Sequence, residues 1–165
     1  DVVEMATYAP LFAHIDGWQW RPDMIWFDNL RSFRSCSWYV QSMYSNNKGT
    51  NVVPCILDHQ KPAAGNDGQD GLFASAVIDK NQKSVIIKIV NTSDRPQEIL
   101  VDIQKGYLKT PVKVNATVFT ADRLDGENTL DEPEKYTPKT HQFTSDTSAF
   151  TAKVGPKTFA MYIAK

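Results

Sequence analysis

The stretch Lys83-Ser84-Val85-Ile86-Ile87-Lys88-Ile89-Val90 decides the fold class. Val85, Ile87 and Ile89 occupy every second position in it, and a period of two is typical of a β-strand that turns one face to a core. The same alternation recurs in three further segments, with apolar residues at Ile99, Val101 and Ile103, at Val112, Val114, Ala116 and Val118, and at Phe159, Met161 and Ile163. The pattern predicts half-buried antiparallel strands.

Short turns connect these strands. Asn81-Gln82 fits a hairpin between residues 74–79 and the strand beginning at Lys83, and Ser93-Asp94-Arg95-Pro96 fits the next turn. Six or so strands joined by turns, with no helix between them, favour a β-sandwich. We therefore expect a mainly β, antiparallel sandwich domain over residues 72–165.

The first fifty residues have a different pattern. Apolar residues at helical spacing predict a helix over residues 1–9, which Pro10 ends. The run Met24-Ile25-Trp26-Phe27 is typical of a strand buried on both faces, as in a parallel sheet. A second helix is expected after an N-cap at Ser35 or Ser37, with its stop at Lys48-Gly49. Residues 1–50 thus read as helix, strand, helix.

Residues 51–71 read as an irregular linker and domain boundary, because residues 61–71 are dense in turn-forming residues. The segment Asn66-Asp67-Gly68-Gln69-Asp70-Gly71 resembles half of a calcium loop. It lacks the regular ligand alternation and the closing glutamate of such a loop, so a turn is the preferred interpretation. No metal site is predicted.

Composition excludes several classes of partner. Eighteen basic and nineteen acidic residues give a net charge of -1, which offers no broad field for nucleic acid or an anionic membrane. No apolar run approaches the roughly 20 residues of a membrane helix. Cys36 and Cys55 define neither a disulfide framework nor a zinc site, and they leave the compartment open. The chain begins at Asp1 without a methionine, which we interpret as a sign that it comes from a longer protein.

The sequence contains no strong catalytic motif. His14, His59 and His141 lie beside no nucleophile motif, so a catalytic triad is not expected. Paired carboxylates for glycosidic cleavage cannot be identified from spacing alone. Two glycosylation sequons begin at Asn91 and Asn115, and we interpret both as chance matches.

Aromatic residues crowd into one block near the N-terminus. All four tryptophans lie within it, and rings interspersed with polar groups suit a sugar, whose C–H faces stack on aromatics while its hydroxyls form hydrogen bonds. Core packing is the competing interpretation. We favour packing for Trp26 and Phe27 inside the predicted strand, whereas both interpretations stay open for Trp18 and Trp20 in the preceding loop.

Three separated motifs resemble the end of family 51 α-L-arabinofuranosidases. The catalytic-barrel end is matched by residues 5–12, by Trp20-Arg21-Pro22-Asp23-Met24-Ile25-Trp26-Phe27-Asp28-Asn29 and by residues 38–45. Residues 127–138 resemble the segment typical of the family's C-terminal domain, and residues 156–162 resemble its last strand. The resemblance implies the last portion of a (β/α)₈ barrel, followed by a jelly-roll-like β-sandwich.

The resemblance also implies a chemistry and a site. The family removes terminal α-L-arabinofuranosyl residues with retention, using two glutamates on earlier barrel strands. Glu4 is the only glutamate in the first 97 residues and lies in neither catalytic motif, so we expect no catalytic residue in this chain. Trp20 matches the last barrel loop near the sugar. Trp18 and Arg21 are weaker candidates for substrate binding.

The sequence is thus interpreted as the C-terminal fragment of a retaining α-L-arabinofuranosidase acting on arabinose-containing polysaccharides or oligosaccharides. The fragment should be inactive alone, need no cofactor, pack against its upstream barrel and meet sugar only in the parent active site. A stand-alone carbohydrate-binding module is the alternative, and it predicts exposed aromatics on one sheet face. A third interpretation is a purely structural domain that could also mediate homo-oligomer contacts.

Overall fold

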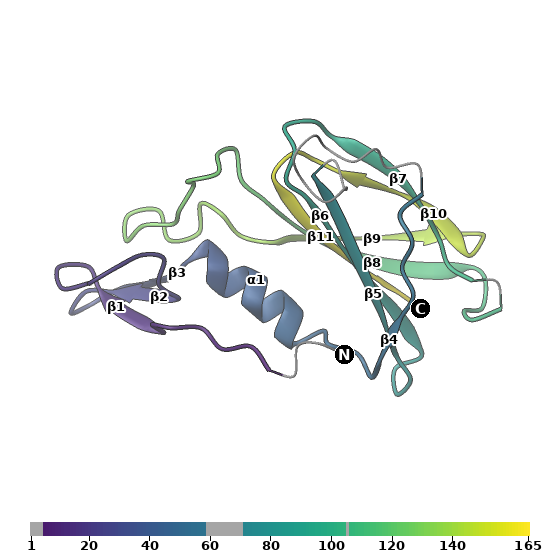
Figure 1. The fold of residues 1–165 in the computed structure, drawn as a ribbon, viewed down its shortest axis with the longest axis horizontal. Helices are drawn as coiled ribbons and strands as arrows, with labels where there is room; N and C mark the ends of the chain where they lie inside the picture. The colour runs from purple at the N-terminus through teal and green to yellow at the C-terminus, as the bar shows by residue number, and fades with distance from the viewer. Residues whose placement is uncertain (1–4, 59–70, 105) are drawn as a thin grey trace.

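A computed structural model describes residues 5–58, 71–104 and 106–165. Three small strands, one helix and a fourth short strand precede seven longer strands (Figure 1). The elements in chain order are β1 (Phe12–His14), β2 (Ile25–Phe27), β3 (Ser32–Arg34), α1 (Cys36–Ser45), β4 (Asn51–Val53), β5 (Leu72–Asp79), β6 (Ser84–Asn91), β7 (Gln97–Asp102), β8 (Val112–Thr120), β9 (Lys139–Ser145), β10 (Ala149–Val154) and β11 (Thr158–Ala164).

The main sheet has six antiparallel strands in the order β4-β5-β6-β11-β8-β9. The predicted hairpin is present, with Asp79 opposite Ser84 and with Asp79 Oδ1 accepting hydrogen bonds from the N–H groups of Asn81 and Gln82. The prediction of a mainly β, antiparallel fold is therefore confirmed.

A second, two-stranded sheet of β7 and β10 covers one face of the main sheet. The alternating residues Val85, Ile87 and Ile89 of β6 point into the core between the sheets, where they meet Phe150 and Ala152 of β10. We refer to these two layers as the two packed sheets. The turn predicted at residues 93–96 connects them rather than forming a hairpin, since β7 pairs with β10 and not with β6.

Asn91 fixes this crossover between the layers. It is completely buried, and its side-chain amide donates to the carbonyl oxygens of Arg95, Val154 and Gly155. Asn115 lies inside β8, paired with β11 on one side and β9 on the other. Both asparagines thus belong to strands of the main sheet.

The other face of the main sheet is covered by α1. Tyr39 and Met43 of the helix pack on Ile86, Phe159 and Met161. Because of this second layer, β6 and β11 are buried on both faces, whereas the sequence pattern predicted half-buried strands. The prediction was wrong for these two strands because apolar residues occupy both sets of alternating positions in each.

Lys88 is the one charged residue that β6 buries beneath the helix, with only 5% of its surface exposed. Its Nζ donates to the Asn47 carbonyl at 2.6 Å and lies 5.0 Å from the centroid of the Tyr44 ring. A cation beyond the C-terminal end of a helix interacts favourably with the helix dipole. Burial nevertheless lowers the pKa of Lys88 below its ordinary value.

The N-terminal strands form a separate three-stranded sheet, which we call the aromatic sheet. β1 pairs with β2 in parallel, and β3 pairs with β2 in antiparallel orientation. A strand within residues 24–27 is confirmed, with its boundaries at Ile25 and Phe27. The expected burial on both faces was wrong, because only Trp26 of this strand is buried and its two neighbours are half-buried. Figure 1 shows this sheet at the end of the molecule away from β7 and β10.

The predicted first helix is wrong over residues 5–9, which have no helical structure; residues 1–4 lie outside the described residues. Main-chain pairing with the strand region begins directly after this segment. The carbonyl of Pro10 accepts from the Met24 N–H, that of Leu11 accepts from the Ile25 N–H, and the Tyr8 hydroxyl donates to the Pro22 carbonyl.

The predicted second helix is confirmed in position but ends earlier than expected. Ser35 is its N-cap, and the Ser35 Oγ accepts from the Trp38 N–H. The helix ends at Ser45 instead of continuing toward Gly49, because the Asn46 and Asn47 side chains donate to the carbonyls of Ser42 and Met43. These amides satisfy backbone acceptors that another helical turn would have used.

The segment expected to be irregular also contains structure. Residues 51–53 form β4, an edge strand paired with β5, so the expectation of irregular backbone was wrong there. The calcium-like half loop lies outside the described residues over 66–70. Among the described residues, no group of three His, Cys, Asp or Glu side chains could hold a metal ion, and no helix is long and apolar enough to cross a bilayer.

Replacement of Ile89 by alanine tests the core between the two packed sheets. Ile89 is almost completely buried, so Ile89→Ala should lower the free energy of unfolding by about 2–5 kcal/mol. Leu100→Ala is the control, since Leu100 on β7 is 71% exposed and its loss should cost about 0.5 kcal/mol or less. Urea denaturation measures both, and equal losses would contradict the assigned core.

Replacement of Lys88 by methionine tests the buried cation. Between the lowered pKa of Lys88 in the folded chain and its ordinary value of 10.5, the folded state binds fewer protons than the unfolded state. The free energy of unfolding of the native chain should therefore rise with pH across that window, relative to Lys88→Met. Denaturation of both proteins at several alkaline pH values measures the difference, and a difference that falls or stays flat would count against a desolvated lysine.

Candidate functional site

The aromatic block folds around Trp26 in the centre of the aromatic sheet. Trp26 is 4% exposed, lies opposite Phe33 across the β2–β3 pair, and stacks on it at 6.5 Å with an interplanar angle of 9°. The packing role predicted for Trp26 is confirmed. Phe27 is half-buried and meets the rings of Phe12 and His14 edge-on.

The side chains of Trp18 and Arg21 pack on Trp26 of the aromatic sheet, and we call these three side chains the stack. The Arg21 guanidinium carbon lies 5.0 Å from the Trp18 ring centroid and 4.9 Å from that of Trp26. The two indoles meet edge-on at 6.0 Å. Arginine commonly stacks on aromatic faces in this manner. Because Trp18 remains 45% exposed, the stack ends in an indole that faces outward.

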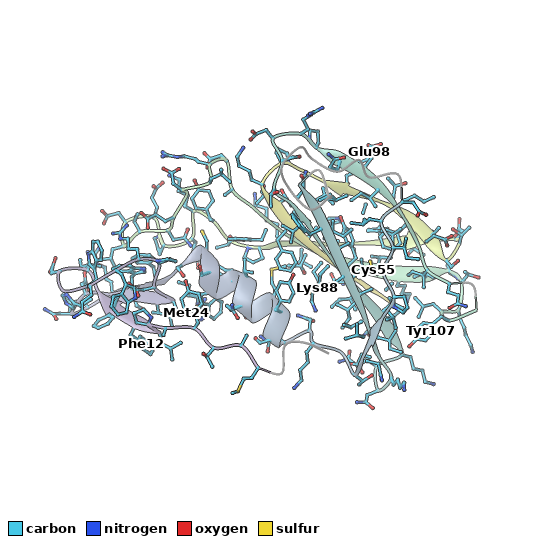
Figure 2. All side chains as sticks on the ribbon, in the orientation of Figure 1. Phe12, Met24, Cys55, Lys88, Glu98 and Tyr107 are labelled. Atoms are coloured by element: carbon cyan, nitrogen blue, oxygen red, sulfur yellow. The ribbon has the colours of Figure 1, made fainter. Side chains whose placement is uncertain are left out.

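Trp20 is placed differently from these two residues. It is 54% exposed, and its ring takes part in no aromatic or cation–π pair among the described residues. The structure therefore brings Trp18 and Arg21 together and leaves Trp20 as a free apolar surface two residues away. Figure 2 shows the side chains of this end of the molecule, with Phe12 and Met24 labelled.

The Arg21 guanidinium also forms an ion pair with Glu127. Nη1 of Arg21 lies 2.7 Å from Oε1 of Glu127, which belongs to the loop between β8 and β9, residues 121–138. The same loop pairs Asp131 with Arg31 at 3.2 Å. Figure 1 shows this β8–β9 loop extending from the main sheet toward the aromatic sheet. Sequence reasoning did not find Glu127, because 106 residues separate it from its partner.

Asn128 anchors this loop. It is completely buried, donates to the carbonyls of Arg34 and Tyr136 at 2.9 and 3.0 Å, and accepts from the Tyr136 N–H at 2.7 Å. Next to it, the Gly126 carbonyl accepts from the Cys36 thiol. A Cβ at Gly126 would lie only 2.9 Å from the Tyr136 ring, so the close approach needs glycine. The Tyr136 hydroxyl in turn donates to Asp122, which lowers the pKa of that carboxyl.

Asp23 lies in the chain between Arg21 and the start of β2, and it is completely buried. Neither of its carboxylate oxygens has a hydrogen-bond partner among the described residues. A buried carboxylate without a donor is costly, so such groups usually have a partner. The acidic residue beside the tryptophans is therefore a polar feature of the site that the sequence pattern did not single out.

The remaining titratable candidates have ordinary structural positions. His14 accepts from the Asp16 N–H through Nδ1, His141 stacks on Phe143, and His59 lies outside the described residues. Burial raises the pKa of the Cys36 and Cys55 thiols, which keeps both protonated at neutral pH. None of these described groups forms a nucleophile–base pair.

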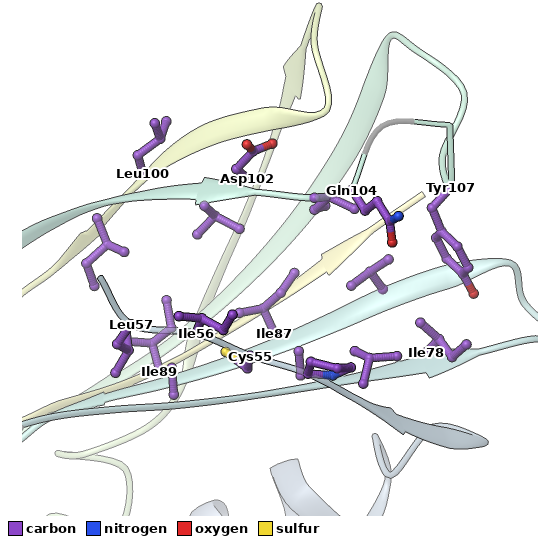
Figure 3. Close-up of a pocket in the computed structure, with 18 residues that line it drawn as sticks. Cys55, Ile56, Leu57, Ile78, Ile87, Ile89, Leu100, Asp102, Gln104 and Tyr107 are labelled. Atoms are coloured by element: carbon purple, nitrogen blue, oxygen red, sulfur yellow. The ribbon is translucent and has the colours of Figure 1, made fainter. Parts of the chain in front are cut away.

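A separate apolar cavity of about 350 Å³ opens between the main sheet and β7 (Figure 3). Aliphatic residues from β5, β6 and β7, together with the segment Val53 to Leu57, line most of it, with Asp102, Gln104 and Tyr107 among the few polar groups. Figure 2 shows Cys55 and Tyr107, both lining residues, far from the aromatic sheet. This lining offers few hydrogen bonds for a sugar, so the aromatic sheet is the better candidate site.

The chain matches a known family over nearly its whole length. The model for the α-L-arabinofuranosidase C-terminal domain matches residues 1–157. α-L-Arabinofuranosidase 1 of Arabidopsis thaliana is 30% identical over 143 residues, which are 84% of this chain and 20% of that protein. An extracellular exo-α-L-arabinofuranosidase of Streptomyces chartreusis is 52% identical over 54 residues, 33% of this chain and 6% of that protein.

Solved structures agree on the fold. An arabinose-bound family 51 α-L-arabinofuranosidase superposes with a TM-score of 0.80 at 23% identity, covering 96% of this chain and 24% of that one. The thermostable family 51 enzyme of Thermotoga petrophila gives 0.75 at 14% identity, covering 87% and 31%. This chain thus spans a fifth or less of the two named curated relatives and under a third of the solved chains. It belongs to the α-L-arabinofuranosidase C-terminal domain family, which confirms the resemblance of its motifs to family 51 enzymes.

Proposed function

We propose that the chain is the C-terminal part of a retaining α-L-arabinofuranosidase, which removes terminal α-L-arabinofuranosyl residues from polysaccharides or oligosaccharides. In this proposal the aromatic sheet and α1 are the last segment of a catalytic (β/α)₈ barrel. The two packed sheets, which include β4, form a jelly-roll-like accessory domain in this proposal and carry no catalytic residue. Family membership supports the proposal, as does the parallel pairing of β1 with β2 ahead of a helix.

The partner of this chain in the proposal is the upstream part of the same barrel. Parallel strands occur almost only in sheets covered on both faces, and the aromatic sheet has just three short strands. Exposed apolar side chains at Leu11 and Phe12 lie at its β1 edge. The orphaned carboxylate of Asp23 would likewise gain a donor from a neighbouring segment or from a sugar hydroxyl. A homo-oligomer remains a further proposal.

Trp18, Trp20 and Arg21 would line one wall of the sugar subsite. The observation that carries this role is the pair of half-exposed indoles two residues apart, one of them held by a stacked guanidinium. An indole presents an apolar face to the C–H groups of a sugar ring and excludes water from it. Arg21 also offers guanidinium N–H groups, although one already bonds Glu127.

Catalysis would depend on residues outside this chain. A retaining glycosidase places two carboxyl groups about 5–5.5 Å apart, one as acid/base and one as nucleophile. In the described part of the chain the aromatic sheet carries no glutamate. Glu127, which lies beside this sheet, already forms an ion pair with Arg21. Trp18, Trp20 and Arg21 would orient the furanose ring toward that pair of carboxyl groups and exclude solvent water from one of its faces. The proposed reaction needs no cofactor or metal.

A stand-alone carbohydrate-binding module receives less support. Such a module needs aromatic rings exposed together on a sheet face. Among the described aromatics of the two packed sheets and their loops, only Phe73 and Tyr107 are largely exposed, one on β5 and the other after β7. Phe150, Phe159 and Tyr162 are buried in the core. A structural role for these sheets is therefore ranked above sugar binding.

Replacement of Trp20 by alanine in the longer parent enzyme tests the proposal. Loss of a stacked indole should lower kcat/KM for a nitrophenyl arabinofuranoside by about 10- to 100-fold, the range expected when one large apolar contact is removed. Phe73→Ala is the matched control, since Phe73 is equally exposed but lies on β5, and it should leave kcat/KM unchanged. Unchanged kinetics of Trp20→Ala, or arabinose release by this 165-residue chain alone, would contradict the proposal.

A further inference from the structure

We propose that Glu127 is a positioning residue, which holds Arg21 and through it Trp18, so that the β8–β9 loop helps to shape the sugar-binding wall. The inference rests on the proposed function, because it assigns a determinant of the same wall. It concerns a residue that lies far from the aromatic block in the sequence and need not touch the sugar itself.

Arg21 contacts both a fixed ring and an exposed ring, and it adds to the direct edge-on contact between these two rings. Trp26 is buried in β2 and cannot move independently of the sheet. The guanidinium lies about equally close to Trp26 and to the half-exposed Trp18, at 4.9 and 5.0 Å. The 2.7 Å bond to Glu127 determines where the plane of this guanidinium sits. Trp18 is therefore oriented by two contacts, its edge-on contact with Trp26 and its contact with the Arg21 guanidinium that Glu127 holds.

Glu127 is itself held by its two neighbours in the sequence. The Gly126 carbonyl accepts from Cys36 at the start of α1, and the Asn128 side chain bridges the carbonyl of Arg34, at the end of β3, to Tyr136. A carboxylate presented from an anchored backbone loses less conformational entropy when it pairs than one on a free loop. The β8–β9 loop thus holds the Glu127 carboxylate in place beside Arg21 before the two side chains pair.

Removal of this charge should affect positioning more than stability. The side chains of Arg21 and Glu127 are both about half exposed, and ion pairs of this kind contribute little to folding. Salt weakens exposed pairs by screening, so added salt should mimic loss of the carboxylate. A second ion pair of the same loop, Asp131 with Arg31, contacts no ring among the described residues and provides a matched comparison.

The kinetic test uses Glu127→Gln in the longer parent enzyme, with Asp131→Asn as control. For Glu127→Gln we expect KM for a nitrophenyl arabinofuranoside to rise by about two- to fivefold, with kcat within about twofold, as one half-exposed ion pair allows. Asp131→Asn should leave both constants unchanged. Added sodium chloride should raise the KM of the native enzyme toward that of Glu127→Gln and have a smaller effect on the variant.

A structural readout in this 165-residue chain separates positioning from sugar binding. In ¹H–¹⁵N spectra, Glu127→Gln should shift the indole N–H signals of Trp18 and Trp26 and leave that of Trp38, whereas Asp131→Asn should move none of the three. Unmoved Trp18 and Trp26 signals would overturn the inference, and so would shifted signals without any rise in KM. Trp18→Ala and Trp20→Ala separate the two proposals. If both variants keep the native kcat/KM while Glu127→Gln still shifts the indole N–H signals of Trp18 and Trp26, the proposed function fails. Glu127 would then position a ring that takes no part in turnover.

Discussion

The buried amide of Asn128 is the constraint on which the arrangement at the aromatic sheet depends. Its side chain donates to the Arg34 carbonyl at the end of β3 and to the Tyr136 carbonyl, and it accepts from the Tyr136 N–H. These bonds connect the β8–β9 loop to the aromatic sheet. Buried amides of this kind are costly to leave unpaired, which makes the connection specific as well as stable. The exposed ion pairs of the same loop, each weak alone, gain their geometry from this anchor.

The second constraint is the two-sided burial of β6 and β11. One set of alternating residues faces the β7–β10 layer and the other faces α1, so the main sheet is the middle of three layers. The helix follows β3 directly, and its first residue bonds the β8–β9 loop through Cys36. The aromatic sheet is therefore connected to the core at two places, through the helix and through the loop. Through this double attachment a residue of the β8–β9 loop, Glu127, reaches Arg21 beside the tryptophans.

Local sequence signals predicted much of the fold. Period-two alternation located β6, β7, β8 and β11, the apolar run located β2, and the serine before Cys36 located the start of α1, because each signal reflects the packing of nearby residues. The helix expected over residues 1–9 is absent from residues 5–9, which lead directly into the main-chain pairing of Pro10 and Leu11 with Met24 and Ile25. β9 was missed since its residues are mostly polar and exposed, as an edge strand permits. Trp18 and Arg21 could be selected by residue type, whereas Glu127 became visible only through its long-range contact with Arg21. The burial of Asp23 without a hydrogen-bond donor is likewise a property of the folded chain that residue type does not reveal.

We propose that the exposed Trp18 and Trp20 indoles, supported by Arg21 and the β8–β9 loop, contact the arabinofuranosyl group in the longer parent enzyme. A crystal structure of that enzyme with bound arabinose tests this contact. The Trp18 or Trp20 indole should lie in van der Waals contact, within about 4.5 Å, of the sugar carbons. The bond between Arg21 and Glu127 should also be retained. A bound sugar with none of Trp18, Trp20 and Arg21 within that distance would contradict this proposal.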